Sequence, residues 1–263
     1  MKLKVLVDNN TYIDRYYLGE PALSYYIEDE DRKILFDTGY SDVYLKNAEK
    51  MGIDLNKIDC LILSHGHNDH TGGLVYLKGK DLSDVTMIAH KEVFIGRTHE
   101  GLYVGSPVKA EELAVKEYID GSKPYQITKK LWYLGQIERV TDFENAPVGI
   151  REDGKPDHLY DDSALVYDTK DGLFIITACS HSGICNIVLY AKKLFGDKHI
   201  KGIIGGFHLL QDNEQLHKTV EFLRNEDIDE LYPCHCVSLY AKHLMYGLGN
   251  VHEVGVGLEL DIE

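Results

Sequence analysis

The sequence predicts an α/β fold with two β layers and helices on the outside. Two observations support this prediction. Strand-like apolar segments alternate with segments of helical periodicity in both halves of the chain. In addition, a strand ends in a histidine-bearing turn just before a helix at four places, residues 65–70, 181, 208 and 235. A chain of 263 residues can bury a substantial core, as one large domain or as two small ones.

The composition of the chain argues against some classes of partner. A net charge of -15 without a basic face argues against a nucleic-acid partner. A small anionic substrate stays compatible, because bound metals would supply local positive charge. No signal-peptide pattern and no apolar run of about 18 residues occurs, so we expect no membrane partner. Five cysteines without a framework spacing suggest a reducing compartment, and we expect a cytoplasmic protein. The expected partner is a small-molecule substrate, and no pattern indicates an oligomeric state.

The N-terminal region predicts a first strand over residues 3–7 and a hairpin of residues 24–28 and 33–36 around an acidic turn. The hairpin ends at Asp37. This carboxylate either closes the turn or stands behind a metal ligand, because metal-bound imidazoles usually donate their other N–H to such a group. Ser41 is expected to cap a helix that Gly52 ends.

The most informative stretch is Ser64–Gly73, which follows a strand-like apolar segment at residues 60–63. Three histidines and one aspartate occur within six residues as H-x-H-x-D-H. Imidazole and carboxylate suit zinc or another divalent first-row metal. An i, i+2 spacing does not place two ligands on one helix face, so we expect a loop site, with a helix from about Leu74. A single histidine here would suggest only a solvated turn.

Residues 96–160 differ from the rest of the chain in being rich in glycine, tyrosine and charge. A segment of this length with little regular pattern is often a lid or a substrate-binding insert. We therefore predict a single domain over residues 1–263 that contains such an insert. The aromatic residues of the segment either line a pocket for a flat ligand or pack the insert onto the domain; they are Tyr103, Tyr125, Trp132 and Tyr133.

The C-terminal half returns to strands and helices. Residues 164–167 and 173–177 flank a turn and predict a hairpin, which leads to His181. A helix with Ile187, Tyr190, Ala191 and Leu194 on one face should follow, and a helix from about Asn213 should follow His208. Residues 228–232 precede His235. Each histidine alone could be structural. Their shared position at strand ends indicates a site where the two halves meet.

Together these motifs resemble the metallo-β-lactamase-fold superfamily. Residues 64–73 are similar to its S-H-G-H-x-D-H-T-G-G signature, residues 35–39 to its D-T-G turn, and residues 179–183 to its third-motif histidine. The similarity spans nearly the whole chain and implies an αββα four-layer sandwich with a dinuclear site between the halves. Four further segments are most similar to the branch named for a dihydropterin ribofuranosylaminobenzene phosphate synthase: residues 161–165, 178–184, 205–209 and 233–236.

The resemblance also implies a set of ligands for two divalent ions. Zinc is the first choice, with manganese, iron or magnesium as alternatives. Carried over by position, the ligands of the first metal would be His65, His67 and His181, and those of the second Asp69, His70 and His235. Asp69 would also orient the nucleophile, and Asp37 would stand behind the ligands.

His208 is where the sequence departs from the family pattern. By chain position it occupies the slot of an aspartate that bridges both metals in most members. A neutral imidazole has one free lone pair and cannot bridge. We expect His208 to bind one metal or to contact the substrate, and we list it with Asp69 as a catalytic residue. A site with a single carboxylate favours an anionic substrate and weakens occupancy of the second position. Asp212 is a substitute bridge, although D-x-x-Q reads more simply as a helix N-cap.

The cysteines on either side of His235 make no chelating pair of the C-x-x-C kind. On a strand, Cys234 and Cys236 would both face away from His235, so we expect them to pack in the interior.

These features favour a metal-dependent hydrolase that acts through a metal-bound hydroxide on a small anionic substrate, such as a phosphate-bearing or pterin-like molecule. A synthase or transferase could use the same dinuclear site, and a non-catalytic protein could bind a ligand in the same pocket. Redox chemistry at a di-iron centre is less favoured, because flavodiiron relatives have glutamate at the position of His67 and need a flavin domain.

Overall fold

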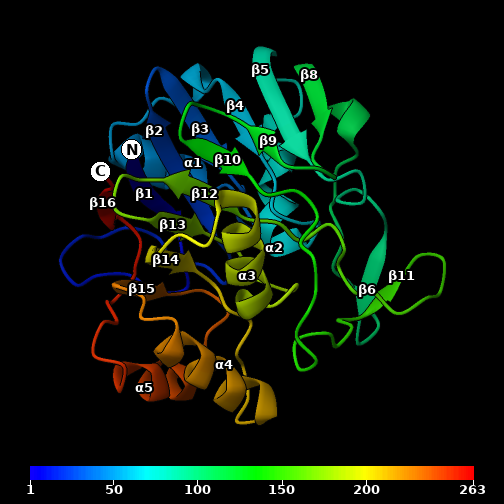
Figure 1. Ribbon diagram of the computed structural model, residues 1–263. Coiled ribbons are helices and arrows are strands. Elements are labelled where there is room, and N and C mark those ends of the chain that lie inside the picture. The colour runs from blue at the N-terminus through cyan, green and yellow to red at the C-terminus, as the bar shows by residue number, and fades with distance from the viewer.

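A computed structural model describes all 263 residues, and it contains two large β-sheets that pack face to face (Figure 1). The first sheet runs in the order β16 (Glu259–Asp261), β1 (Lys2–Val7), β2 (Ser24–Asp29), β3 (Arg32–Phe36), β4 (Cys60–Ile62), β5 (Leu82–Ala89) and β8 (Val115–Asp120). The second runs β15 (Glu230–Pro233), β14 (Ile200–Gly205), β13 (Leu173–Ile176), β12 (Leu165–Asp168), β10 (Leu131–Tyr133) and β9 (Tyr125–Gln126). Both predicted hairpins are present as antiparallel pairs.

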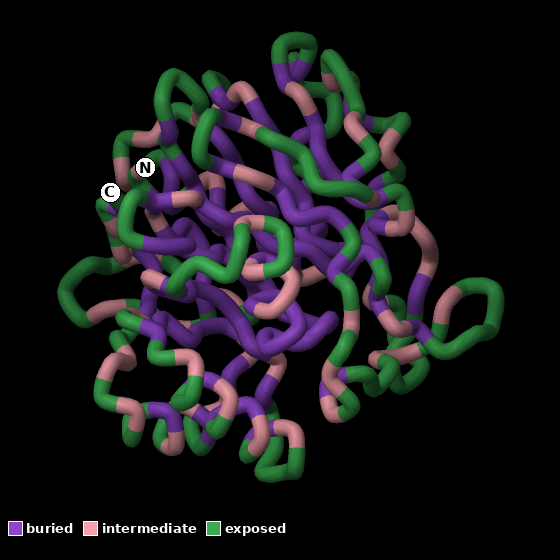
Figure 2. Tube along the Cα trace, viewed as in Figure 1, coloured by how far each residue is buried: buried purple, intermediate pink, exposed green.

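Helices cover the outer face of each sheet. The α-helices are α1 (Val43–Lys50), α2 (Asn68–Thr71), α3 (Ile184–Phe195), α4 (Glu214–Asn225) and α5 (Leu239–Tyr246), and the 3₁₀ turns are η1 (Leu55–Lys57), η2 (Gly72–Leu77) and η3 (Ala110–Glu112). One apolar cluster lies between the sheets, one joins the first sheet to α1 and η2, and one joins the second sheet to α3, α4 and α5. Buried residues accordingly run through the centre of the molecule (Figure 2). The predicted αββα sandwich is confirmed.

The parallel strands explain why distant motifs meet. β3, β4 and β5 are parallel neighbours in the first sheet, and β13, β14 and β15 are parallel neighbours in the second. Carboxyl ends of parallel strands lie at one edge of a sheet. The predicted site residues that follow these ends are Asp37 after β3, His65 after β4, His181 after β13, His208 after β14 and His235 after β15.

Residues 96–160 are divided between the main sheets and a smaller one. β8 extends the first sheet, and β9 and β10 extend the second. Outside them, β6 (Arg97–His99), β7 (Leu102–Tyr103) and β11 (Ile150–Arg151) form a three-stranded sheet at the periphery (Figure 1). Tyr133 is buried between the main sheets and Trp132 packs edge-on against Phe195, so these two aromatics serve packing. A lid or substrate role for the remainder stays a prediction.

Three local expectations were wrong. The chain does not form an α-helix from Leu74: α2 starts inside the motif and the 3₁₀ turn η2 follows. Gly72 and Gly73 make this geometry possible, because a Cβ on either would lie about 2.3 Å or less from a carbonyl oxygen of the loop after β3. Asp42, not Ser41, is the N-cap of α1, and Asn213, not Asp212, caps α4 by accepting a hydrogen bond from the Leu216 amide.

Of the residues expected on one apolar face of α3, Ile187 and Ala191 are buried, but Leu194 is exposed. The longest helices, α3 and α4, have 12 residues each, and none of the helices is long and apolar enough to cross a membrane.

Candidate metal centre

The carboxylate of Asp37 orients two imidazoles of the histidine-rich motif. It accepts hydrogen bonds from the Ser64 amide and hydroxyl at 2.8 and 2.7 Å, and its Oδ2 lies 2.8 Å from His70 Nδ1. Because the Ser64 proton goes to Asp37, the Ser64 oxygen accepts from His65 Nδ1 at 2.9 Å. Both imidazoles are therefore protonated at Nδ1, and Nε2 is the atom left to bind a metal. Asp37 therefore lies behind two predicted ligands, and its role behind a bound metal stays a prediction.

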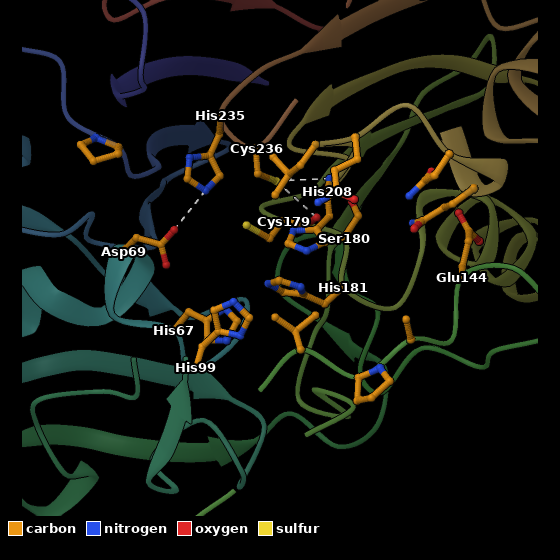
Figure 3. A pocket seen from close by; sticks show the side chains of 18 of the residues that line it. His67, Asp69, His99, Glu144, Cys179, Ser180, His181, His208, His235 and Cys236 are labelled. Carbon is orange, nitrogen blue, oxygen red and sulfur yellow. Dashed lines mark hydrogen bonds and ion pairs between the residues drawn. The ribbon is translucent and has the colours of Figure 1, made fainter. Parts of the chain in front are cut away.

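Three predicted ligands of the second metal converge on one point. His70 Nε2 lies 3.2 Å from His235 Nε2 and 3.6 Å from Asp69 Oδ2, and His235 Nε2 lies 3.3 Å from the same oxygen (Figure 3). The Asn9 side-chain oxygen accepts from His235 Nδ1 at 3.0 Å, which again leaves Nε2 free. With metal–donor bonds of about 2.0 to 2.1 Å, the corners of a tetrahedron are about 3.3 Å apart. These donors fit a divalent ion of the size of zinc.

The three predicted ligands of the first metal also gather in one place. The rings of His65, His67 and His181 lie 4.7 to 4.9 Å apart between centroids, and each residue is at most 8% exposed. The Nε2 atoms of His65 and His67 and both ring nitrogens of His181 are buried without a hydrogen-bond partner. Buried polar atoms are nearly always paired. This cluster of unpaired imidazole nitrogens therefore fits a cation at the first metal position, in addition to the one that the Asp69, His70 and His235 donors fit.

Burial sets the charge of this first group. Burial lowers the pKa of His65 and His181 well below the usual value, and it lowers that of His67 to about 3. These imidazoles are neutral at pH 7 and offer lone pairs. For His70, burial lowers the pKa, but the Asp69 and Asp37 carboxylates outweigh it and raise the pKa to about 9. A positive charge is thus favoured between Asp37 and Asp69 even without a metal.

Two neighbouring aspartates hold the two histidine turns in place. Asp161 accepts a hydrogen bond at 2.8 Å from the Gly66 amide, between His65 and His67, and it pairs with the buried Arg97 at 3.1 Å. Asp162 accepts from the Ser182 amide at 2.8 Å, next to His181. Burial raises the pKa of Asp162 to about 6. In the sequence these aspartates contribute only to the family resemblance, and Arg97 is not predicted at all, since a buried arginine has no sequence signal of its own.

His208 lies beside the centre rather than between the two groups of donors. Its ring is 4.4 Å from that of His181, and its ligand atoms group with Cys179 and Cys236, not with Asp69. Its role as a ligand or a substrate contact stays a prediction. Asp212 is exposed and pairs with His217 at 2.7 Å, so it is no bridge between metals.

The cysteine expectation was right for Cys234 and wrong for Cys236. Cys234 is buried in the core between the sheets, 3.4 Å from the Tyr25 hydroxyl. Cys236 instead faces the site, where its sulfur accepts a hydrogen bond from the His208 amide at 3.3 Å. β15 ends at Pro233 and His235 has a φ of +50°, so the alternation of a strand does not extend to Cys236. Cys179 also faces the donors and was not predicted.

An open cavity lies beside the donor groups and is lined by His67, Asp69, His181 and His235 (Figure 3). Its volume is about 590 Å³. Its wall contains amide side chains from two segments and no lysine or arginine; the amides are Asn9, Gln211, Asn213 and Gln215. His99 also lines the cavity, and no sequence pattern pointed to it. Pro147 and Val148 show that part of the 96–160 segment forms this wall. The cavity suits a small polar molecule that reaches the metal donors.

An αββα sandwich with clustered histidine, aspartate and cysteine side chains at its seam, which could hold metal ions, is the architecture of the metallo-β-lactamase type. A family model described as the metallo-beta-lactamase superfamily matches residues 18–235, and the chain belongs to this superfamily.

Three relatives cover nearly the whole chain. The chain is 33% identical over 255 residues to "Uncharacterized protein MJ0448" of Methanocaldococcus jannaschii, covering 94% of this chain and 95% of that protein. It is 28% identical over 264 residues to the 7,8-dihydropterin-6-methyl-4-(beta-D-ribofuranosyl)-aminobenzene-5'-phosphate synthase of the same organism, covering 93% and 90%. The crystal structure of Tm1679, described as a metal-dependent hydrolase of the beta-lactamase superfamily, matches with a TM-score of 0.86 at 32% identity, covering 100% and 99%.

Proposed function

We propose that this protein is a metal-dependent hydrolase that cleaves a phosphate ester of a small polar molecule. The observation behind the proposal is the set of converging donor atoms at the floor of an open cavity. The description of the 32% identical Tm1679 as a metal-dependent hydrolase supports the same class. When bound, divalent ions at this centre would lower the pKa of water to about 7 and polarise a phosphoryl oxygen.

The side chains of the chain would supply orientation. The Asp69 side chain is 28% exposed and faces the cavity, so its carboxylate can accept a hydrogen bond from the attacking water. His208 lies in the cavity wall with a buried, unpaired Nδ1, and we assign it to a hydrogen bond with the substrate. His99 stands on the opposite, insert-derived part of the wall and offers a further hydrogen bond.

The wall also suggests which part of the substrate carries the charge. Because no lysine or arginine lines the cavity, the positive charge that attracts a phosphate would come from the metals alone. The phosphate would therefore lie at the donor cluster, where cleavage occurs. The amide side chains suit an uncharged, hydrogen-bonding remainder such as a pterin or a ribose.

The test is turnover by protein loaded with zinc or manganese on a panel of phosphomonoesters, phosphodiesters, lactones and thioesters. We expect hydrolysis of a phosphate ester that a chelator abolishes and added metal restores. The variant His67→Ala should lose it, whereas His217→Ala, an exposed histidine, should retain it. Metal-loaded protein without turnover on the whole panel would contradict the proposal.

A synthase is the second candidate, and the 28% identical relative named a synthase is the observation in its favour. The same centre would then direct an arylamine, in place of water, to a carbon of the pterin donor that carries a phosphate-ester group, so that a C–N bond forms as the C–O bond breaks and the phosphate leaves. Incubation with a pterin donor and a ribofuranosylaminobenzene phosphate would give a joined product if this candidate is correct, and only hydrolysed donor if it is not.

All five cysteines are free thiols, in line with a cytoplasmic site of action.

A further inference from the structure

We propose that the thiolate of Cys179 is a metal ligand shared by both ions of the centre. Its sulfur lies 3.2 Å from His70 Nε2, and it forms one group with donor atoms of Asp69 and His235, all within 4.8 Å of one another. The same sulfur forms a second group, within the same limit, with His65 and His181. Cys179 is therefore the side chain that reaches the predicted ligands of both metals from the second sheet.

The sulfur completes the geometry of the second metal. Asp69 Oδ2, His70 Nε2 and His235 Nε2 are 3.2 to 3.6 Å apart. The sulfur adds a fourth donor, 3.2 Å from His70 Nε2 and within 4.8 Å of the other two. Zinc in proteins prefers four donors at the corners of a tetrahedron and accepts thiolate readily. On binding, the thiol releases its proton to solvent, because the thiolate is the ligand.

The turn that presents Cys179 is firmly held. Cys179 is 3% exposed and follows the end of β13. The next residue, Ser180, has a φ of +55°, and its hydroxyl donates to the Gly206 carbonyl at 2.7 Å. The Gly206 amide in turn donates to the Ala178 carbonyl at 2.8 Å. These bonds to the turn after β14 fix the direction of the Cys179 side chain toward the donors.

A shared thiolate also accounts for the departure at His208. His208 occupies the sequence position of the bridging aspartate, but its ring lies beside His181 and Cys236 and cannot bridge two ions. A sulfur has several lone pairs and supplies the second anionic ligand of the centre, next to Asp69. Because thiolate selects softer ions, we expect zinc, cobalt or iron to bind in preference to magnesium or manganese.

A shared Cys179 thiolate requires the metal centre of the proposed function but not its reaction. The test therefore measures metal–sulfur bonds and not turnover. The probe is zinc alone, added to two equivalents, with X-ray absorption at the zinc edge. We expect one sulfur neighbour per zinc at about 2.3 Å. Half a sulfur per zinc would mean that the thiolate binds one ion only, and it would overturn the sharing. Absence of sulfur, or binding of a single zinc, would overturn it as well.

Two variants identify which sulfur is bound. Cys179→Ser should remove the sulfur signal, and it should also abolish the thiolate-to-metal charge-transfer band of the cobalt-loaded protein. Cys236→Ser is the matched control, since Cys236 also faces the cavity, and it should retain both signals. The reverse pattern would refute the assignment. The measurement on the unaltered protein decides the question even if a variant fails to fold.

Discussion

The two groups of donor atoms in this protein are built differently. The first consists of the neutral imidazoles of His65, His67 and His181, and its turns are held mainly through backbone amides that donate to Asp161 and Asp162. The second consists of Asp69, His70, His235 and, by our proposal, Cys179. Its imidazoles are oriented by side-chain hydrogen bonds to Asp37 and Asn9.

The difference has a consequence for metal binding. In the second group the donor atoms already lie at the separations that a tetrahedral ion needs, and the carboxylate adds negative charge. The sequence led us to expect weak occupancy of the second position, since a bridging aspartate is missing there. The donor separations of the second group are an argument against that expectation, and which position binds a metal more tightly stays a prediction.

The largest effect is expected from replacing Asp69, because this residue lies close to both groups of donor atoms. Its carboxylate lies in one group with His70 and His235 and in another with His65 and His67, so it borders both predicted metal positions. In Asp69→Asn we expect a loss of about 10²- to 10⁴-fold in kcat/KM, because the variant cannot orient the nucleophile. Bound zinc should fall as well, measured by metal analysis after gel filtration. Full zinc content with unchanged kcat/KM would exclude a role for Asp69 in either group.

Arg97 tests the backbone-based support of the first group. The side chain is buried and pairs with Asp157 at 3.3 Å and with Asp161 at 3.1 Å. Arg97→Met leaves two buried carboxylates without their cation, and it should lower the free energy of unfolding by about 3 to 5 kcal/mol. Urea denaturation measures this change.

A matched control lies in the same small sheet. Arg151 pairs with Glu92 and Asp153 but is partly exposed, so Arg151→Met should change the free energy of unfolding by about 1 kcal/mol or less. Equal effects of the two substitutions would show that the Arg97 pairs are no more important than surface pairs.

Asp37 tests the side-chain support, which it gives directly to His70 in the second group and through Ser64 to His65 in the first. In Asp37→Asn, the amide cannot accept from both Ser64 and His70 as the carboxylate does. We expect zinc affinity to fall about 10- to 100-fold, as for other carboxylates behind metal-bound histidines. Titration with a competing chelator measures it. Asp229→Asn is the control, because Asp229 also lies 2.8 Å from a histidine, His199, but on the surface. A similar loss in the control would refute the role of Asp37.

The smallest effect is expected at Glu144, which lies in the cavity wall near the start of α3. Its replacement should change how the stability of the protein depends on pH. Burial raises the pKa of Glu144, while its carboxylate accepts from the Cys185 amide at 3.0 Å. The protonated Glu144 carboxyl therefore stabilises the folded state fully at a pH below its usual pKa. This stabilisation is lost as the pH rises through the pKa that Glu144 has in the folded protein.

Relative to the unaltered protein, Glu144→Gln should become more stable as the pH is raised from 4 to 7. Thermal unfolding of the metal-free proteins at both pH values measures this difference, with the partly exposed Glu138→Gln as control. A constant difference between variant and unaltered protein would contradict the raised pKa.

Much of the site could be predicted because its residues follow strand ends. Residues 65–70 are close in the chain and must be close in space, and the strand-end rule for parallel sheets places His181 and His235 at the same edge. Cys179 and Cys236 were missed or misplaced for the opposite reason. They lie in turns whose neighbours Ser180 and His235 have positive φ, and strand alternation does not predict side-chain direction there.

The sequence by itself determined the αββα architecture, the H-x-H-x-D-H turn and the approach of the later histidines, because apolar periodicity and strand ends are local properties. Only the tertiary structure decided which atoms face one another. The hydrogen bonds from Asp37 and Asn9, the buried Arg97 and the sulfur of Cys179 join segments far apart in the chain. Such contacts depend on how two sheets pack, and no local pattern encodes that packing.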